Sequence, residues 1–345
     1  MEKNLISLVV PCFNEEDVIV EAHRRLAALA DSQPDYRFEF LFIDDGSRDS
    51  TLLLLRQIVA TDSRASVVAF SRNFGHQLAV TAGIDEARGD AVVLLDADLQ
   101  DPPEVVSEML ANWCKGWQVV YGIRTEREGE SRFKLWTAHM FYRILNYLSD
   151  TPIPLDTGDF RLMDRAVVEV LRGMPERDRF VRGMVSWVGF RQLALPYRRA
   201  ARVAGVTKYP LRKMIQFASN GIISFSIRPL KLAIDVGLLC AGLACAGIIW
   251  AFAMRLATHN WVPGWTATII AVLFLGGIQL VCTGILGEYI GRTYMQSKGR
   301  PLYIISERIG RARVADQAVP QLGTPPKIGG RSFVGTQSTG DEREP

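Results

Sequence analysis

The chain has 345 residues, 48% of them hydrophobic, which is enough for one large domain or two smaller ones. Its net charge of +3 is too small to indicate a nucleic-acid partner, and its five irregularly spaced cysteines form no CxxC pair, so we expect neither a disulfide framework nor a zinc site. The first apolar run is too short for a signal peptide and acidic residues follow it, so we expect the N-terminal domain to stay in the cytoplasm.

Short apolar runs alternate with helix-like segments up to about residue 200. The runs are Leu5–Val10, Phe38–Ile43, Ser66–Phe70 and Ala91–Leu95, and the helix-like segments are Glu15–Asp31, Ser50–Thr61, Gln77–Ala87 and Pro103–Lys115. This alternation predicts an α/β domain over residues 1–208, with a mostly parallel sheet and helices on both of its faces. Near-continuous apolar strands fit this fold, because both faces of such a sheet are covered.

Polar residues directly follow the first two predicted strands, as Pro11–Glu16 and as Asp44–Ser47. Each segment alone could be a helix cap, because Asp, Asn and Ser are favoured there. The carboxyl ends of parallel strands, however, lie at one edge of the sheet, where open α/β folds bind ligands. We therefore expect oxygen atoms of these segments to bind the base and ribose hydroxyls of a nucleoside.

The strongest single motif is Leu94–Pro103, in which an apolar strand ends in two carboxylates separated by one residue. Asp96 and Asp98 would lie near the carboxyl edge of the sheet, and Gln100 offers a further oxygen ligand. Mg²⁺ and Mn²⁺ prefer oxygen ligands and typically join one or two carboxylates to substrate phosphates. A simple turn is the alternative, but the position after a buried strand favours a Mg²⁺ or Mn²⁺ site that holds the diphosphate of a nucleotide sugar.

Two long uncharged runs follow, Val236–Met254 and Trp261–Gly287. Since ~20 apolar residues cross a bilayer, we predict transmembrane helices at about 232–256 and 263–288, within a region 229–291. The alternative is a buried hairpin in a soluble core, although a soluble domain seldom needs two such runs in tandem.

Basic residues flank both runs, whereas the loop between them carries only Arg255. They are Arg212, Lys213, Arg228 and Lys231 before the first run, and Arg292, Lys298, Arg300 and Arg308 after the second. By the positive-inside rule, we expect a multi-pass protein of the cell inner (plasma) membrane, with the first domain and both termini cytoplasmic.

The segments around the two runs have different characters. Apolar residues at helical spacing predict an amphipathic juxtamembrane helix over 209–228, lying on the cytoplasmic leaflet, with a helix packed on the first domain as the alternative. We expect residues 292–312 to form a cytoplasmic juxtamembrane segment. Residues 313–345 are rich in Gly, Pro, Ser and Thr and predict a disordered tail.

Three segments, Pro11–Glu15, Asp44–Ser47 and Asp96–Pro103, resemble the signature segments of the family 2 glycosyltransferases, whose catalytic domain has the Rossmann-like GT-A fold. The narrower resemblance, over about residues 5–310, is to the polyisoprenyl-phosphate glycosyltransferases, which include dolichol-phosphate mannose synthases and bactoprenol glucosyltransferases. The two-span end looks like the bactoprenol group. The resemblance implies inverting transfer of one sugar from a nucleotide sugar to polyprenyl (undecaprenyl) phosphate on the cytoplasmic leaflet, with UDP-glucose as the first expectation for the donor.

The same resemblance implies roles for single residues. The nucleoside would be held by Pro11, Phe13, Glu15 and Asp44, with Asp45 close by. Arg72–Gly75 matches a segment beside the donor. Asp159, within Thr157–Arg161, would lie near the reacting sugar, and Arg202 and Lys208 match a late basic loop that reaches phosphates.

The chemistry of a lipid phosphate acceptor narrows these roles. A phosphomonoester has a second pKa of about 6, so it is mostly ionised near neutral pH and needs little help from a base. It needs cations that bring it close to an anionic donor, and Arg124, Arg132, Arg202 and Lys208 suit that role. A solvated surface charge is the alternative for each arginine, which Arg124 and Arg132 leave most open. We therefore expect Asp159 to orient a substrate rather than to act as a base, and a metal at Asp96 and Asp98 to stabilise the departing diphosphate.

Several alternatives stay open at the level of sequence. GDP-mannose or a UDP-linked amino sugar could replace UDP-glucose. A processive polysaccharide synthase is disfavoured, because the Gln-x-x-Arg-Trp motif is absent around Arg177–Arg182 and only two spans are visible. An inactive binding protein is disfavoured by the intact Asp96 and Asp98. The spacings Gly287-x-x-x-Gly291 and Gly237-x-x-x-Ala241 would allow a homo-oligomer or simply close packing of the two spans.

Overall fold

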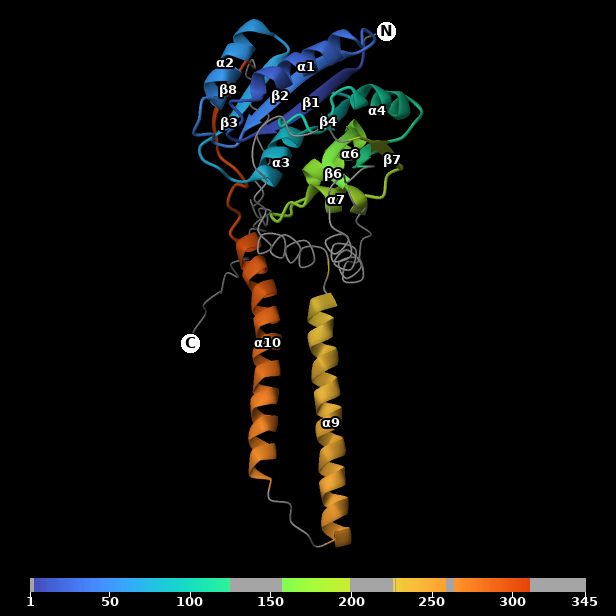
Figure 1. The fold of residues 1–345 in the computed structure, drawn as a ribbon, viewed down its shortest axis with the longest axis vertical. Helices are drawn as coiled ribbons and strands as arrows, with labels where there is room; N and C mark the ends of the chain where they lie inside the picture. Colours follow the sequence, from blue (N-terminus) through green and yellow to red (C-terminus); the bar gives the residue numbers. More distant parts are fainter. Residues whose placement is uncertain (1–2, 125–156, 199–225, 227, 259–263, 311–345) are drawn as a thin grey trace, which may run out of the picture. The chain divides into compact units, whose positions relative to one another are not determined.

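The computed structural model describes residues 3–124, 157–198, 226, 228–258 and 264–310 (Figure 1). In chain order the elements are β1 (Leu5–Cys12), α1 (Ile19–Asp31), β2 (Arg37–Asp44), α2 (Thr51–Thr61), β3 (Ala65–Phe70), α3 (His76–Glu86), β4 (Ala91–Leu94), α4 (Val105–Cys114), β5 (Val119–Arg124), β6 (Thr157–Asp164), α6 (Arg165–Gly173), α7 (Val181–Trp187), β7 (Gln192–Tyr197), α9 (Arg228–Thr258), α10 (Trp265–Ser297) and β8 (Ile305–Ile309). The strands and helices predicted before residue 116 are confirmed, with ends that differ by a few residues.

In the part of the chain that the structure describes, eight strands form one sheet in the order β7-β5-β6-β4-β1-β2-β3-β8. β1 runs parallel to both β2 and β4, and β2 runs parallel to β3. The chain therefore proceeds to one side of β1 through β2 and β3 and then crosses to its other side at β4. Such a reversal of strand order leaves a crevice at the carboxyl ends of the strands, which is where open α/β sheets bind ligands.

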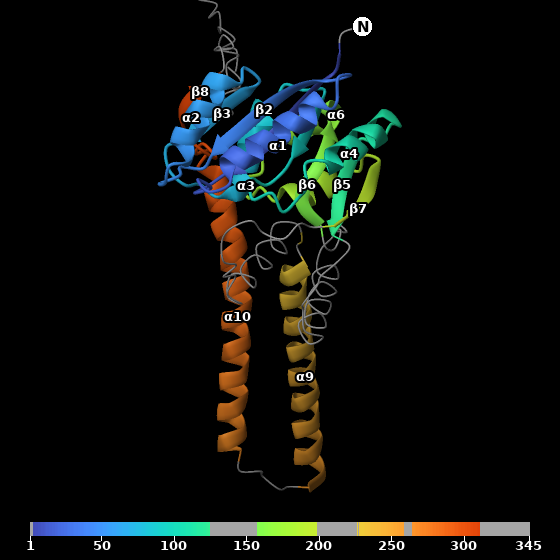
Figure 2. The same cartoon turned by 45° about the horizontal axis from the view of Figure 1, so that its top comes forward.

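Helices cover both faces of this sheet, as predicted (Figures 1 and 2). One core layer joins the sheet to α1, α2 and α4, through buried side chains such as Leu26, Leu55 and Met109. The other joins it to α3, α6 and α7, through Ile84, Val168 and Met184. β1 and β2 are almost entirely buried, which explains their continuous apolar sequence.

β6 is antiparallel to β4, and this pairing brings the start of β6, far along the chain, to the edge of the sheet where the parallel strands end, here called the ligand edge. Leu94 pairs with Arg161, so continuing the same register beyond β4 places position 96 opposite position 159. β5 lies on the other side of β6 and ends at Arg124 at the same edge. The sheet is therefore mixed on this side, whereas its central strands are parallel as predicted.

β8 follows the second long helix and pairs antiparallel with β3 at the edge of the sheet. It lies within 292–312, for which only a juxtamembrane segment was expected. Tyr303 stacks on Phe70 with ring centroids 5.0 Å apart, and its hydroxyl donates to Asp85. The segment thus adds the last strand to the sheet and covers an edge strand, β3, that would otherwise expose unpaired backbone groups.

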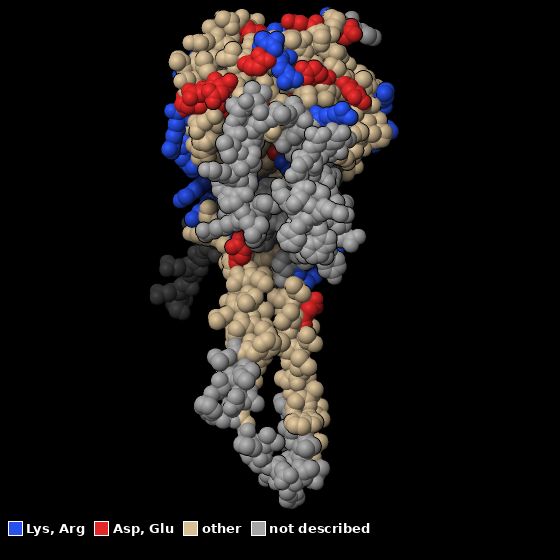
Figure 3. Space-filling view, viewed as in Figure 1, with Lys and Arg blue, Asp and Glu red and all other residues tan. Residues whose placement is uncertain are grey.

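α9 and α10 run side by side in both views (Figures 1 and 2). Among the described residues, these two helices are long and apolar enough to cross a membrane. Their large apolar side chains are exposed, for example Leu238 at 67% and Leu280 at 76%, so a buried soluble hairpin does not account for them. Figure 3 shows the charged side chains gathered over the sheet domain and a largely uncharged surface along the helices.

The helical bounds differ from the predicted spans mainly at one end. α10 continues to Ser297, about two turns past the expected end of the span near residue 288. Most of the expected amphipathic helix at 209–228 and the whole of the expected tail at 313–345 lie outside the described residues.

Candidate active site

The loops after β1 and β2 are joined by hydrogen bonds, which brings two of the predicted nucleoside-binding segments together. Asn14 has a left-handed backbone with φ of 56°, and its side-chain Oδ1 accepts from the Arg48 backbone N at 2.9 Å. The Asn14 backbone N donates to Ser47 Oγ at 3.0 Å, and Glu15 N donates to Thr51 Oγ1 at 2.8 Å. Pro11, Phe13, Glu15, Asp44 and Asp45 therefore belong to one continuous edge of the sheet.

Asp44 and Asp45 are both buried, but they have different surroundings. Asp44 accepts long hydrogen bonds from Ser47 N, at 3.3 Å to each carboxylate oxygen, and burial raises the pKa of its carboxyl. Asp45 uses both oxygens to accept from the backbone N of Phe74 and Gly75, at 2.7 and 2.9 Å. Asp45 therefore fixes the loop before α3, which leaves Asp44 as the carboxylate with more capacity for a nucleoside.

The predicted metal ligands lie in a tight loop after β4. Leu99 has a left-handed φ of 57°, and Asp98 Oδ1 accepts from the Gln100 backbone N at 3.1 Å. The side-chain Oε1 of Gln100 is buried and has no hydrogen-bond partner among the described residues. An unpaired oxygen in the same short loop as two carboxylates fits a hard divalent cation. In the described ranges, no group of three or more His, Cys, Asp or Glu is arranged to hold a metal ion.

Asp96 is the carboxylate with the most perturbed surroundings in this loop. Removal from water raises its pKa to about 6, and the nearby charges of Asp159, Asp101 and Asp98 act in the same direction, against His76. About a third of its side chain, 32%, is still exposed at the edge. A divalent cation would reverse this penalty, since it is the largest local charge in such a site.

Asp159 lies at the centre of a hydrogen-bond network next to Asp96. Its Oδ1 accepts from Arg182 Nε at 2.8 Å, and its Oδ2 accepts from Gln77 Nε2 at 3.1 Å. His76 Nε2 lies 3.1 Å from the same Oδ2 and 3.8 Å from Asp96 Oδ1. The imidazole therefore bridges the two carboxylates that the β4–β6 register places opposite each other.

These contacts determine the charge of Asp159. Burial opposes ionisation, but the hydrogen bond from His76 and the charge of Arg182 outweigh it and hold the pKa of Asp159 well below its usual range. Burial alone would lower the pKa of His76, because it also disfavours the charged imidazolium. The carboxylates of Asp159 and Asp96 outweigh burial, so the pKa of His76 is raised overall. A carboxylate with a depressed pKa is a weak base near neutral pH, which agrees with an orienting role.

Comparisons with known proteins identify the family. Residues 7–172 match the model of Glycosyl transferase family 2, and residues 228–293 match the GtrB C-terminal hairpin. The chain is 48% identical over 304 residues to the uncharacterized glycosyltransferase YkcC of Bacillus subtilis, covering 88% of this chain and 94% of that protein. It is 41% identical to the uncharacterized glycosyltransferase sll0501 of Synechocystis sp., covering 88% and 96%. It is 42% identical to the bactoprenol glucosyl transferase of Shigella phage SfV, covering 87% and 97%.

The chain belongs to glycosyl transferase family 2. It is a glycosyltransferase with an α/β domain of the GT-A type and two apolar helices at its C-terminal side, as the sequence predicted. The processive-synthase alternative is disfavoured further, because the GtrB hairpin model accounts for both helices.

Within the described ranges, the predicted site residues of the loops after β1, β2 and β4 lie at the same edge of the sheet as Asp159. The predicted basic residues are less well described. Arg124 ends β5 at the ligand edge, beside Tyr197 of β7, but its side chain is outside the description. Arg132, Arg202 and Lys208 lie outside the described residues, so their roles stay predictions.

Three side chains in this glycosyltransferase were missed from sequence: His76, Gln77 and Arg182. Each contacts Asp159 across 23 to 83 positions of chain. No local spacing connects them, because the β4–β6 register and the packing of α3 against α7 create the contact. The one available signal was the position of His76 and Gln77 directly after Arg72–Gly75, the segment already matched to the donor side.

Proposed function

We propose that this protein transfers a single glucose from UDP-glucose to polyprenyl phosphate, with undecaprenyl phosphate as the acceptor, and inverts the anomeric centre. Relatives named bactoprenol glucosyl transferase support this activity, since they align with the chain over 97% of their own length. The observation that carries the proposal is the acidic loop Asp96–Gln100 opposite Asp159, on a chain that continues into the GtrB hairpin.

In the proposed reaction, an oxygen of the acceptor phosphate bonds to C1 of glucose while the bond from C1 to the UDP oxygen breaks. The products are polyprenyl phosphoglucose and UDP, and no proton needs to leave the ionised acceptor. Pro11, Phe13, Glu15 and Asp44 bind the nucleoside. Arg124, Arg132, Arg202 and Lys208 offset the repulsion between the two phosphate-bearing substrates.

Asp96, Asp98 and Gln100 are the residues that would hold Mg²⁺ or Mn²⁺. That ion would supply Lewis-acid stabilisation of the charge that develops on the departing diphosphate. Asp159 stays ionised between Arg182 and His76 and orients a sugar hydroxyl or the acceptor, because a carboxylate held in this way is a poor proton acceptor.

The proposal also places the protein in the inner (plasma) membrane as a two-span protein, with the catalytic domain and both termini in the cytoplasm. Basic residues on the domain side of both helices support this orientation. The homo-oligomer stays a prediction from Gly287, Gly291 and their counterparts in α9.

One experiment separates the candidate donors. Membranes that contain the protein are incubated with undecaprenyl phosphate and a panel of labelled UDP-glucose, GDP-mannose and UDP-linked amino sugars, with Mn²⁺ or Mg²⁺. We expect labelled glycolipid from UDP-glucose alone, and none when Asp98→Ala membranes are used. Glycolipid from GDP-mannose or an amino sugar instead would replace the proposed donor, and no glycolipid from any donor would refute lipid glycosylation.

A further inference from the structure

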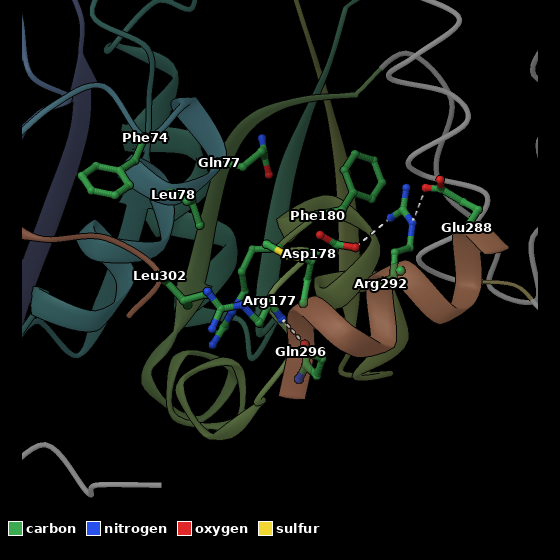
Figure 4. Close-up of a pocket in the computed structure, with 13 residues that line it drawn as sticks. Phe74, Gln77, Leu78, Arg177, Asp178, Phe180, Glu288, Arg292, Gln296 and Leu302 are labelled. Atoms are coloured by element: carbon green, nitrogen blue, oxygen red, sulfur yellow. Dashed lines mark hydrogen bonds and ion pairs between the residues drawn. The ribbon is translucent and has the colours of Figure 1, made fainter. Parts of the chain in front are cut away.

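A cavity of about 730 Å³ lies between the sheet domain and the adjoining end of α10 (Figure 4). One wall comes from α3 and the residues just before it, a second from the loop between α6 and α7, and a third from the last turns of α10. In Figure 4, Phe74 and Leu78 lie across the space from Arg292 and Gln296 on α10, with Arg177 between the two groups. The volume falls within the ~300–1,000 Å³ that is typical of small-molecule sites.

Hydrogen bonds hold the walls of this cavity together. Gln296 Nε2 donates to the Pro175 carbonyl at 2.8 Å, and its Oε1 accepts from the Arg177 backbone N at 3.1 Å. Arg292 pairs with Asp178 at 2.7 Å. The end of the membrane helix is therefore tied to the α6–α7 loop, and the space between them is built into the fold.

The lining combines apolar and cationic side chains. Phe74, Leu78, Phe180, Met295 and Leu302 supply apolar surface from every wall. Arg292 pairs with both acids of the lining, Asp178 and Glu288. Arg177 and Arg179 donate to backbone carbonyls, so the net charge of the described lining is positive. This chemistry suits a ligand with a hydrocarbon part and an anionic head. α10 continues from the cavity as an apolar, exposed helix, which would give such a ligand a route from a bilayer.

Gln77 connects the cavity to the reacting centre. It lines the cavity, donates to Asp159 Oδ2 at 3.1 Å, and accepts from the Val181 backbone N at 3.1 Å through its Oε1. Its neighbour His76 reaches both Asp159 and Asp96. One side chain therefore separates the cavity from Asp159. The described lining includes no residue of the loops after β1 and β2, to which the proposed function assigns the nucleoside.

We propose that this cavity binds the isoprene units nearest the phosphate of the polyprenyl phosphate acceptor. The assignment rests on the proposed function and adds to it a location. The space holds a few isoprene units and not a long polyprenyl chain, so the remainder of the chain stays in the bilayer along α10. The phosphate end then passes Gln77 to reach Asp159.

Gly291 offers a direct test, because it lines the cavity and a Cβ built on it would meet no atom within 4 Å. A Gly291→Leu side chain would project into the open space without a clash, and leucine favours the helix. We expect the KM for undecaprenyl phosphate to rise about tenfold or more, since lost burial of as few as two carbons corresponds to that factor. The KM for UDP-glucose is expected to stay unchanged.

The matched control is Gly284→Leu, about two turns away on the same helix, outside the described lining of the cavity and equally free of contacts at its Cβ. It keeps a wild-type KM for the lipid if the cavity is the cause. Equal effects of the two substitutions, or none from Gly291→Leu in an enzyme that makes glycolipid, would overturn the cavity assignment alone. A wild-type protein that makes no glycolipid would refute the proposed function instead.

A second measurement does not depend on variants. Undecaprenyl phosphate with a diazirine on the isoprene unit nearest the phosphate is photolysed with the full-length protein, and labelled peptides are mapped. We expect label in residues 174–182 and 288–297, and its loss with excess unlabelled undecaprenyl phosphate. Label confined to other segments, or label that excess phosphatidylglycerol displaces equally well, would contradict an acceptor site and assign the cavity, at most, to bulk lipid.

Discussion

Asp159 depends on Arg182 for its position, because Arg182 supplies two of the donors to its carboxylate. Removing the guanidinium would leave a buried carboxylate with His76 and Gln77 as its remaining described side-chain partners. We expect Arg182→Ala to lower kcat about 100-fold, as displacement of a positioned group by about 1 Å does, and Arg182→Lys to recover part of the loss. The KM for UDP-glucose is expected to change little, which steady-state kinetics of both variants would establish.

A suitable control for this pair is Arg24→Ala on α1, since Arg24 pairs with Glu21 on an exposed surface, where such pairs contribute little. That variant is expected to match the wild type. An Arg182→Ala enzyme with normal kcat would mean that Asp159 does not need its partner.

An Asp159→Asn enzyme that retains most activity would support an orienting role for Asp159. Complete loss of activity with intact donor binding would indicate that Asp159 acts as a base.

The proposed metal site should depend on pH through Asp96. Its pKa of about 6 without a metal is above the usual value for aspartate, so protons compete with a cation below that pH. Mn²⁺ affinity is expected to be constant above pH 7 and to fall about tenfold per pH unit below 6, since one proton must leave for each ion bound. Calorimetric titration from pH 5 to 8 measures this.

The matched variant is Asp96→Asn, which removes the titrating group. We expect it to bind Mn²⁺ more weakly than the wild type at pH 7 and with a shallower dependence on pH. A wild-type affinity that does not change between pH 5 and 8 would show that Asp96 is not a ligand.

At the scale of elements, the parts of the fold that local sequence encodes were predictable. β1, β2, β3 and β4 are apolar runs buried on both faces, and the acidic loop after β4 carries its chemistry within five residues. The contacts of Asp159 were not predictable, because an antiparallel strand far along the chain creates them. β8 was missed although its burial alternates, since five residues beside a membrane span give a weak signal.

Gly310 ends β8 and fixes how that strand meets the sheet. Its φ is +79°, and a Cβ there would lie 2.8 Å from the Ala65 carbonyl oxygen and 2.5 Å from Val59 Cγ1. We expect Gly310→Ala to destabilise the protein by about 2–3 kcal/mol, through the left-handed backbone and the contact with the carbonyl. Thermal unfolding in detergent, followed by fluorescence, would measure the loss.

A substitution at Gly299 separates the cost of a left-handed backbone from the cost of close packing. Gly299 also has a positive φ, +58°, but a Cβ there would meet nothing within 4 Å. Gly299→Ala is expected to cost only the backbone term, about 1 kcal/mol. If the two variants unfold at the same temperature, close packing at the end of β8 is not what holds the strand.

At the scale of the whole molecule, the sheet domain is discontinuous in sequence. Residues 1–208 were expected to form it alone, but β8 comes from beyond α10 and supplies the last strand next to β3. Ion pairs from Arg56 to Glu307 and from Arg308 to Glu86 tie this strand to α2 and α3. The helical hairpin is therefore an insertion between two parts of one sheet, and the last turns of α10 are tied to the loop between α6 and α7.

This arrangement predicts the behaviour of a soluble fragment. A chain cut after residue 208 leaves β3 as a bare edge and removes the ring that stacks on Phe70, so we expect it to aggregate. Joining residues 301–311 to its end through a flexible Gly/Ser linker restores β8 and should give a monomer by size-exclusion chromatography. The same fusion with both Glu307→Pro and Arg308→Pro should aggregate like the shorter fragment, because these neighbouring residues pair with Ala69 and Val68 and proline removes the ladder donor there. A short fragment that is already monomeric and unfolds at the same temperature as the fusion would show that the sheet does not need its eighth strand.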